Sequence, residues 1–134
     1  KKPKFVFAHF LAPHGPFSLD ENGNLYSPFN SGRSHKEEEK DGYIKALTFI
    51  NKKIYSVIKE IIQKSPKPPI IILQADHGSR LENDALTILS AYHLPKNGKK
   101  LLYPTISPIN NFRVVFNHYF NTKLPLLSDN TEKT

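Results

Sequence analysis

Asp76 and His77 are the neighbouring residues in this sequence best suited to hold a metal ion. They precede Gly78 and directly follow the apolar run 70–75, IIILQA. A carboxylate oxygen beside an imidazole nitrogen suits a divalent metal, and this mixture favours Zn²⁺ or Mn²⁺ over Ca²⁺, which prefers oxygen ligands alone. Gly78 allows a sharp backbone turn after the pair. The alternative is that Asp-His-Gly only ends a strand as a turn.

His14 is the second candidate, because it stands between two prolines in APHGPF, residues 12–17. An imidazole held there could donate a hydrogen bond to an anionic oxygen of a substrate. The alternative is a loop histidine packed against Phe17. His9 alternates with apolar residues along an expected strand, which by itself favours a hydrogen-bonded core histidine. The other three histidines, at positions 35, 93 and 118, show no spacing to a partner.

Two apolar runs lead into these candidates. Residues 4–11 (KFVFAHFL) and 70–75 are short and rich in aromatic or β-branched side chains, so each is predicted to be a buried strand. Apolar residues recur every three or four positions within 36–64, which predicts a helix between the two strands. Gly42 leaves open whether HKEEEKD, residues 35–41, is a frayed first turn or loop. A strand–helix–strand crossover makes the strands parallel and brings their carboxyl ends to one edge. We therefore expect His14 and Asp76 at the same edge of the sheet.

The remaining elements complete a layered α/β domain. Residues 85–94 are predicted to be a further strand. Ser107 and Pro108 indicate the N-cap and first position of a helix over 109–120, which we expect to bury Phe112, Val115, Phe116 and Tyr119. Residues 18–40 are expected to be the most irregular part. The sequence thus predicts one domain, 1–134, with a layered, mostly parallel sheet flanked by helices.

Composition excludes several classes of protein. The 134 residues include no cysteine, which rules out disulfides, zinc–thiolate sites and thiol catalysis in this sequence. No apolar run reaches the roughly 20 residues that span a bilayer. The net charge is +7, but the lysines are dispersed, so nucleic acid is not an expected partner. The absence of any methionine indicates a piece of a longer protein.

Four segments together carry a resemblance to a known family. They are HFLAPHGPF, the long helix after it, PPIIILQADHG and LYPTISPINNFRVVFNHYF. Over nearly its whole length the chain resembles the C-terminal half of a sulfatase-like domain, in the superfamily of alkaline phosphatase and sulfatase. It is most similar to the bacterial group in which this domain follows membrane-spanning helices. The phosphoethanolamine transferases carry a similar pair of histidines, with the same five-residue step, followed by Gly-Pro.

The resemblance implies a role for each candidate. Asp76 and His77 match the late metal-ligand pair of the family, and His14 and His9 match histidines that contact the anionic group of the substrate. It implies an alkaline-phosphatase-like fold, a divalent metal cofactor and an anionic ester substrate, with a lipid or a glycan among the candidates. It also implies an extracytoplasmic domain of a bacterial membrane protein, completed by the upstream half of the same domain.

The nucleophile is missing from the matched region. The family uses a threonine, a serine or a modified cysteine, which lies upstream together with the first acidic ligand, so no catalytic residue is assigned in this chain. Two ligands hold a metal weakly, and we expect the chain alone to be inactive. The resulting hypothesis is part of a metal-dependent sulfatase or phospho-transferase acting on sulfate or phosphate esters. The alternative is a catalytically silent sulfatase-like binding or structural module.

Overall fold

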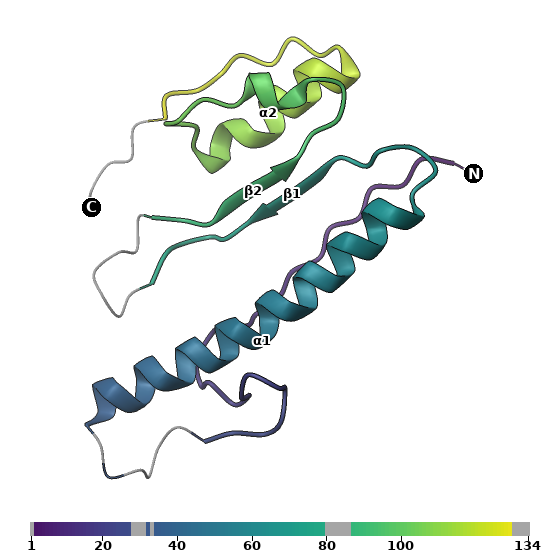
Figure 1. Ribbon diagram of the computed structural model, residues 1–134. Helices are drawn as coiled ribbons and strands as arrows, with labels where there is room; N and C mark the ends of the chain where they lie inside the picture. Colours follow the sequence, from purple (N-terminus) through teal and green to yellow (C-terminus); the bar gives the residue numbers. More distant parts are fainter. Residues whose placement is uncertain (1, 28–31, 33, 80–86, 130–134) are drawn as a thin grey trace. The chain divides into compact units, whose positions relative to one another are not determined.

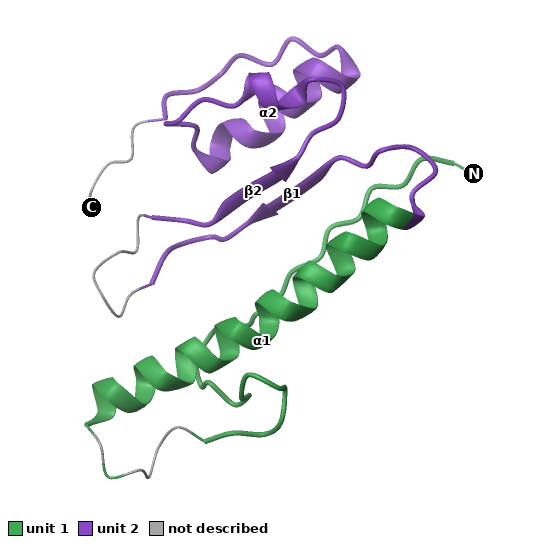
Figure 2. Cartoon of the chain, viewed as in Figure 1, with its two compact units in different colours: residues 1–63 green, residues 64–134 purple. Residues whose placement is uncertain are grey.

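The computed structural model describes residues 2–27, 32, 34–79 and 87–129 (Figure 1). The chain divides into two compact units, residues 1–63 and residues 64–134, and each is described by itself (Figure 2). Unit 1 contains the helix α1 (His35–Lys64) except for its last residue. Unit 2 contains four elements in the order β1 (Ile71–Gln74), β2 (Ser90–His93), the 3₁₀ helix η1 (Gly98–Leu101) and α2 (Pro108–Phe120). Among the described residues, no helix is long and apolar enough to cross a membrane.

The start of α1 is fixed by a capping box. The backbone N–H and the hydroxyl of Ser34 donate to Glu37 Oε2 at 3.0 and 2.6 Å, and the Glu37 N–H donates back to Ser34 Oγ at 3.4 Å. These bonds satisfy amide groups that a helix start leaves without intrahelical partners. The helix predicted over 36–64 is confirmed. The irregular loop predicted over 18–40 is wrong for residues 35–40, which form the first turns of α1.

The segment before α1 folds back on itself within unit 1. Leu19 and Leu25 form an isolated antiparallel bridge, and Asp20 Oδ1 accepts the backbone N–H groups of Asn22 and Asn24, each at 2.8 Å. Hydrogen bonds from Asn24 lower the pKa of Asp20. Residues 18–26 are therefore an ordered turn, while residues 28–31 and 33 of the predicted loop lie outside the described residues.

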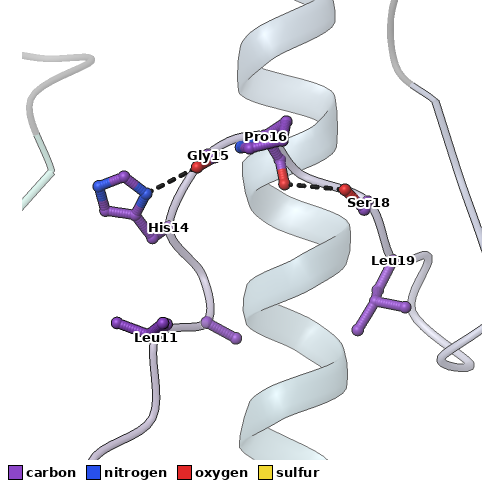
Figure 3. A pocket seen from close by; sticks show the side chains of 7 residues that line it. Leu11, His14, Gly15, Pro16, Ser18 and Leu19 are labelled. Carbon is purple, nitrogen blue, oxygen red and sulfur yellow. Dashed lines mark hydrogen bonds between the residues drawn. The ribbon is translucent and has the colours of Figure 1, made fainter.

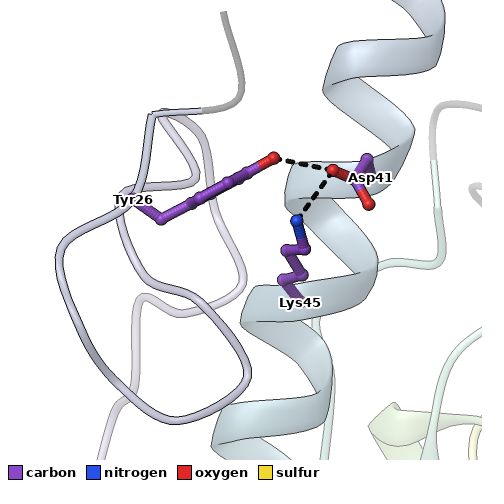
Figure 4. A network of polar contacts seen from close by, with 3 residues as sticks. All are labelled: Tyr26, Asp41 and Lys45. Carbon is purple, nitrogen blue, oxygen red and sulfur yellow. Dashed lines mark hydrogen bonds and ion pairs between the residues drawn. The ribbon is translucent and has the colours of Figure 1, made fainter. Parts of the chain in front are cut away.

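A polar contact joins this turn to α1 (Figure 4). The Tyr26 hydroxyl donates to Asp41 Oδ2 at 2.6 Å, and Lys45 Nζ donates to the same oxygen at 3.0 Å. Lys45 Nζ also lies 4.1 Å from the centre of the Tyr26 ring, a cation–π distance. The hydrogen bond to Asp41 raises the pKa of Lys45.

Two sequence predictions about the sheet are wrong. The described residues contain one two-stranded antiparallel sheet, in which Ile71 faces His93 and Gln74 faces Ser90, instead of a layered, mostly parallel sheet. Residues 4–11 form no strand, and Phe7 is 77% exposed. An apolar run becomes a strand only when a neighbouring strand pairs with its N–H and C=O groups. In the described part of the chain no strand pairs with residues 4–11, and the one backbone bond to this run is local, from the His14 N–H to the Leu11 carbonyl.

The other predicted strands are confirmed in shorter form. β1 covers four of the six residues expected over 70–75. β2 covers Ser90–His93 of the strand expected over 85–94, whose first two residues lie outside the described residues. The ladder continues one step past β1, where the Ala75 N–H donates to the Leu89 carbonyl at 2.9 Å.

α2 begins as the sequence predicts, with extended Ser107 at the N-cap and Pro108 in the first turn. Its buried face differs from the predicted one. Val115 is buried as expected, but Phe112 and Phe116 are exposed, and the buried side includes Asn110 and Asn111 with no exposed surface. Asn111 accepts a hydrogen bond from the Tyr92 hydroxyl at 2.7 Å and donates to Gln74 Oε1 at 2.5 Å, so it links α2 to both strands.

Residues 122–129 run in extended form along α2, and we call them the C-terminal strap. The Asn117 side chain donates to the Leu124 carbonyl and accepts the Leu124 N–H, each at 2.8 Å. The Asn110 side chain does the same for Leu127, at 2.8 and 2.9 Å. Between them, Arg113 donates to the Pro125 carbonyl at 2.9 Å. One face of the helix therefore supplies the hydrogen bonds that a neighbouring strand would supply.

Asp129 closes the end of the strap. Its carboxylate accepts the hydroxyl and backbone N–H of Ser107 at 2.5 and 2.7 Å, the Tyr103 hydroxyl at 2.5 Å and the Asn110 amide at 2.9 Å. These donors favour the charged carboxylate, and they hold the pKa of Asp129 far below its ordinary value.

Gly98, at the start of η1, is a close-packing position. A Cβ atom built there would lie 2.1 Å from Tyr119 Oη and 2.7 Å from Leu94 Cβ. The Tyr119 hydroxyl donates to the Pro95 carbonyl, so the ring is held across this glycine. The sequence KNGKK, residues 96–100, is typical of a turn. The structure shows that close packing also requires its glycine.

Candidate functional site

The pair Asp76–His77 lies just beyond the end of β1. The His77 N–H donates to Asp76 Oδ1 at 3.0 Å, and His77 Nδ1 lies 2.7 Å from the Gly78 carbonyl oxygen. A carbonyl oxygen only accepts, so the proton of the neutral ring is on Nδ1 and the lone pair is on Nε2. His77 Nε2 lies 3.9 Å from Asp76 Oδ2. One nitrogen and one oxygen atom that could bind a metal ion are therefore presented side by side.

This donor pair fits a divalent metal ion. Ligands held at about 2.1 Å from one ion lie roughly 3.0–3.5 Å from each other, so a small rotation of either side chain would close the gap. The Asp76 side chain is 87% exposed and the His77 side chain 40% exposed, which leaves room for that rotation. A metal-ligating histidine usually donates its other N–H to a carbonyl or carboxylate, as His77 does. Among the described residues, no third histidine or acidic side chain completes a metal-binding group.

His14 lies in a tight turn within unit 1. Its backbone N–H donates to the Leu11 carbonyl at 2.7 Å, and the Ala12–Pro13 and Gly15–Pro16 peptide bonds on either side are cis. His14 Nδ1 lies 2.7 Å from the Gly15 carbonyl oxygen (Figure 3). The histidine lines a shallow cavity of about 370 Å³ that extends from Leu11 to Leu19.

Phe17 anchors this turn on α1. Its side chain is buried and packs edge-to-face on Tyr43, with ring centroids 5.9 Å apart. His14 itself is exposed, so its imidazole is accessible to a ligand while Phe17 fixes the backbone nearby. His9 is exposed too, with its ring centroid 6.5 Å from that of Phe7. The interpretation of His9 as a core histidine is therefore wrong, and its contact with substrate stays a prediction.

Asp76 and His77 are the candidates that the structure places side by side. Asp76 and His77 form one local arrangement in unit 2, and His9 and His14 belong to unit 1. His14 and Asp76 belong to different units, and their common sheet edge stays a prediction.

The carbonyl partners of the two histidines are the functional groups that sequence reasoning missed. His14 and His77 are each followed by glycine, and in both cases the glycine carbonyl accepts the Nδ1 proton at 2.7 Å. The repeated His-Gly dipeptide was the available signal. His93 Nδ1 likewise donates to the Pro69 carbonyl at 2.7 Å, whereas His118 uses Nε2, 3.3 Å from the Lys96 carbonyl.

Comparison with known proteins gives one match. The family model described as Sulfatase matches residues 1–125. No curated protein and no solved structure matches the chain. Members of the matched family act on ester substrates and generally use a divalent metal ion, which agrees with the chemistry of the Asp76–His77 pair.

Proposed function

Because the chain belongs to the sulfatase family, we propose that it forms part of a metal-dependent enzyme that cleaves or transfers sulfate or phosphate esters. The observation that carries this proposal is the side-by-side placement of Asp76 Oδ2 and His77 Nε2, 3.9 Å apart beyond β1. Asp76 would supply the oxygen ligand and His77 the nitrogen ligand. With one imidazole among the ligands, Zn²⁺ or Mn²⁺ fits better than Ca²⁺.

A bound divalent metal would neutralise negative charge on the ester group and polarise it. The Asp76 carboxylate orients the His77 backbone by accepting its N–H, and the Gly78 carbonyl orients the His77 ring. His14, and His9 five residues before it, would face the anionic ester. The nucleophile and the remaining ligands would come from the upstream half of the same domain, so we assign no catalytic residue in this chain.

The resemblance to the bacterial group supports two further parts of this proposal. The parent protein would be a membrane protein that carries this domain outside the cytoplasm. Its substrate would be an anionic ester, with a lipid or a glycan as the part that is not transferred.

Calorimetric titration of the 134-residue chain with Zn²⁺ and with Mn²⁺ near neutral pH tests the metal site. We expect weak binding that is lost in Asp76→Asn and in His77→Ala, because each variant leaves a single ligand. His118→Ala is the matched control, since it removes an exposed histidine of the same unit whose Nε2 is bonded to Lys96. Binding should be unchanged in that control.

Three outcomes would count against parts of the proposal. Binding that survives both Asp76→Asn and His77→Ala would remove the pair as ligands. Tight binding that both variants abolish would keep the pair but overturn the expected weakness, and His14 would be the first group to test as an additional ligand. Absence of binding at millimolar metal would favour the catalytically silent module.

A further inference from the structure

His14 offers one ring nitrogen to a ligand, and the structure indicates which one. Its Nδ1 is 2.7 Å from the Gly15 carbonyl oxygen, which has no proton to give. The neutral ring must therefore carry its proton on Nδ1 and its lone pair on Nε2. This is the same arrangement as at His77 and Gly78, and it is the reverse of His118, whose Nε2 faces a carbonyl.

The Gly15 carbonyl is well placed to hold this arrangement. Pro16 follows it, and its pyrrolidine ring fixes the backbone φ angle of Pro16, the torsion next to the Gly15 carbonyl. The Pro16 carbonyl in turn accepts the Ser18 hydroxyl at 3.1 Å (Figure 3). Phe17 is buried and packs on Tyr43 of α1. The His14 N–H is bonded to Leu11 on the other side. The carbonyl thus belongs to a segment fixed at both ends.

We infer that Gly15 is a positioning residue whose carbonyl holds His14 as the Nδ1-protonated tautomer, so that neutral His14 presents substrate with a hydrogen-bond acceptor at Nε2. The sequence expectation that His14 donates to an anionic oxygen then applies only to the imidazolium form. Neutral His14 accepts a hydrogen bond at Nε2, so its partner must be a hydrogen-bond donor. A hydroxyl group of the substrate fits this requirement. The substrate role rests on the proposed function, whereas the tautomer does not.

Nitrogen-15 NMR of the histidine-labelled chain tests the inference without any ligand. At pH 8.5, two units above the ordinary imidazole pKa of about 6.5, the long-range ¹H–¹⁵N pattern identifies the protonated nitrogen of each ring. We expect Nδ1–H for His14 and His77, and Nε2–H for His118. The same chain in concentrated urea provides the reference, in which all three rings should show one common pattern.

An Nε2–H pattern for His14 in the folded chain, or the urea pattern, would overturn the inference. Neither result would touch the proposed function, because metal binding by Asp76 and His77 is measured separately by calorimetry. Pro16→Ala then tests the positioning. This variant should shift the ¹H–¹⁵N pattern of His14 towards that of the urea reference and leave the pattern of His77 unchanged. An unchanged His14 pattern would refute the positioning role of the Gly15 carbonyl.

Discussion

Two extended segments of this protein, residues 4–11 and the C-terminal strap 122–129, differ in whether their backbone N–H and C=O groups have hydrogen-bond partners. Neither is a strand in the structure. The strap has its backbone groups bonded by side chains of α2, above all by Asn110 and Asn117. Residues 4–11 have no such partners among the described residues, and their apolar side chains are largely exposed, including Phe5 and Phe7 at 77% each.

The difference teaches what an extended chain requires. Its N–H and C=O groups need partners, but these need not come from another strand. Asparagine can serve because its amide presents a donor and an acceptor together, which matches the N–H and C=O of one residue in the strap. An apolar run such as residues 4–11 has the side chains of a buried strand, but it cannot supply its own pairing.

The largest expected effect on stability is at Asn110, the buried residue of α2 that binds the strap. Asn110→Ala removes the partners of the Leu127 backbone and one donor to Asp129, so we expect a loss of about 2–4 kcal/mol in the free energy of unfolding. Urea unfolding followed by circular dichroism measures it. The matched control is Asn117→Ala, at a more exposed anchor, with an expected loss of about 1 kcal/mol. Equal losses at both positions would show that burial of the asparagine does not determine how much its hydrogen bonds to the strap contribute to the free energy of unfolding.

A smaller effect should appear on acidification. Hydrogen bonds from Ser107 and Tyr103 lower the pKa of Asp129 in the folded state, so ionised Asp129 stabilises the fold above its unfolded value of 3.8. That contribution is lost progressively as pH falls below about 4, because the unfolded chain then binds a proton that the folded carboxylate, with its lowered pKa, does not yet take up. Unfolding measured from pH 2 to 7 should therefore show a drop in stability that is reduced in Asp129→Asn. Asp20, whose pKa is also lowered, remains in both proteins, so the difference between their profiles isolates Asp129. Identical profiles of stability against pH in the two proteins would contradict the role of ionised Asp129 in holding the end of the strap.

The smallest effect is expected in residues 4–11. Phe7→Lys should change the free energy of unfolding by no more than about 0.5 kcal/mol, because this side chain is already exposed. The control is Val115→Ala in α2, which removes two buried carbons worth roughly 0.8 kcal/mol each and leaves a cavity, for a loss of about 2 kcal/mol. If Phe7→Lys destabilises the chain as much as the control does, residues 4–11 pack on a surface in solution.

The elements that depend on local patterns could be predicted from the sequence. Periodicity predicted the body and the end of α1, although it left open whether residues 35–41 are helix or loop, and Ser107-Pro108 predicted the start of α2. The capping box of α1 was also readable, because Ser34 stands three residues before Glu37. These features succeed because their partners lie within one turn of helix.

Features that depend on distant partners could not be predicted. Nothing in the run 4–11 tells whether a neighbouring strand is available, so the predicted layered sheet failed there. The buried face of α2 was misread because the interpretation counted apolar residues, whereas Asn110 and Asn111 are buried by their bonds to residues up to 37 positions away. At the candidate site, residue types identified the histidines and Asp76. The tautomers of His14 and His77 could be assigned only from the positions of the Gly15 and Gly78 carbonyls, which the sequence does not give.

Gly98 restricts how this sequence can drift over evolutionary time. A Cβ there would collide with Tyr119, and also with Leu94 Cβ, which is fixed to the backbone. Shortening Tyr119 would relieve only the first collision, so no single second-site change opens position 98 to another amino acid. Gly15 is different, since a Cβ there would lie 3.9 Å from Phe17, an ordinary contact. A lineage could therefore replace Gly15 and keep its carbonyl, whereas replacing Gly98 would require the loop from Leu94 to Leu101 to be rebuilt.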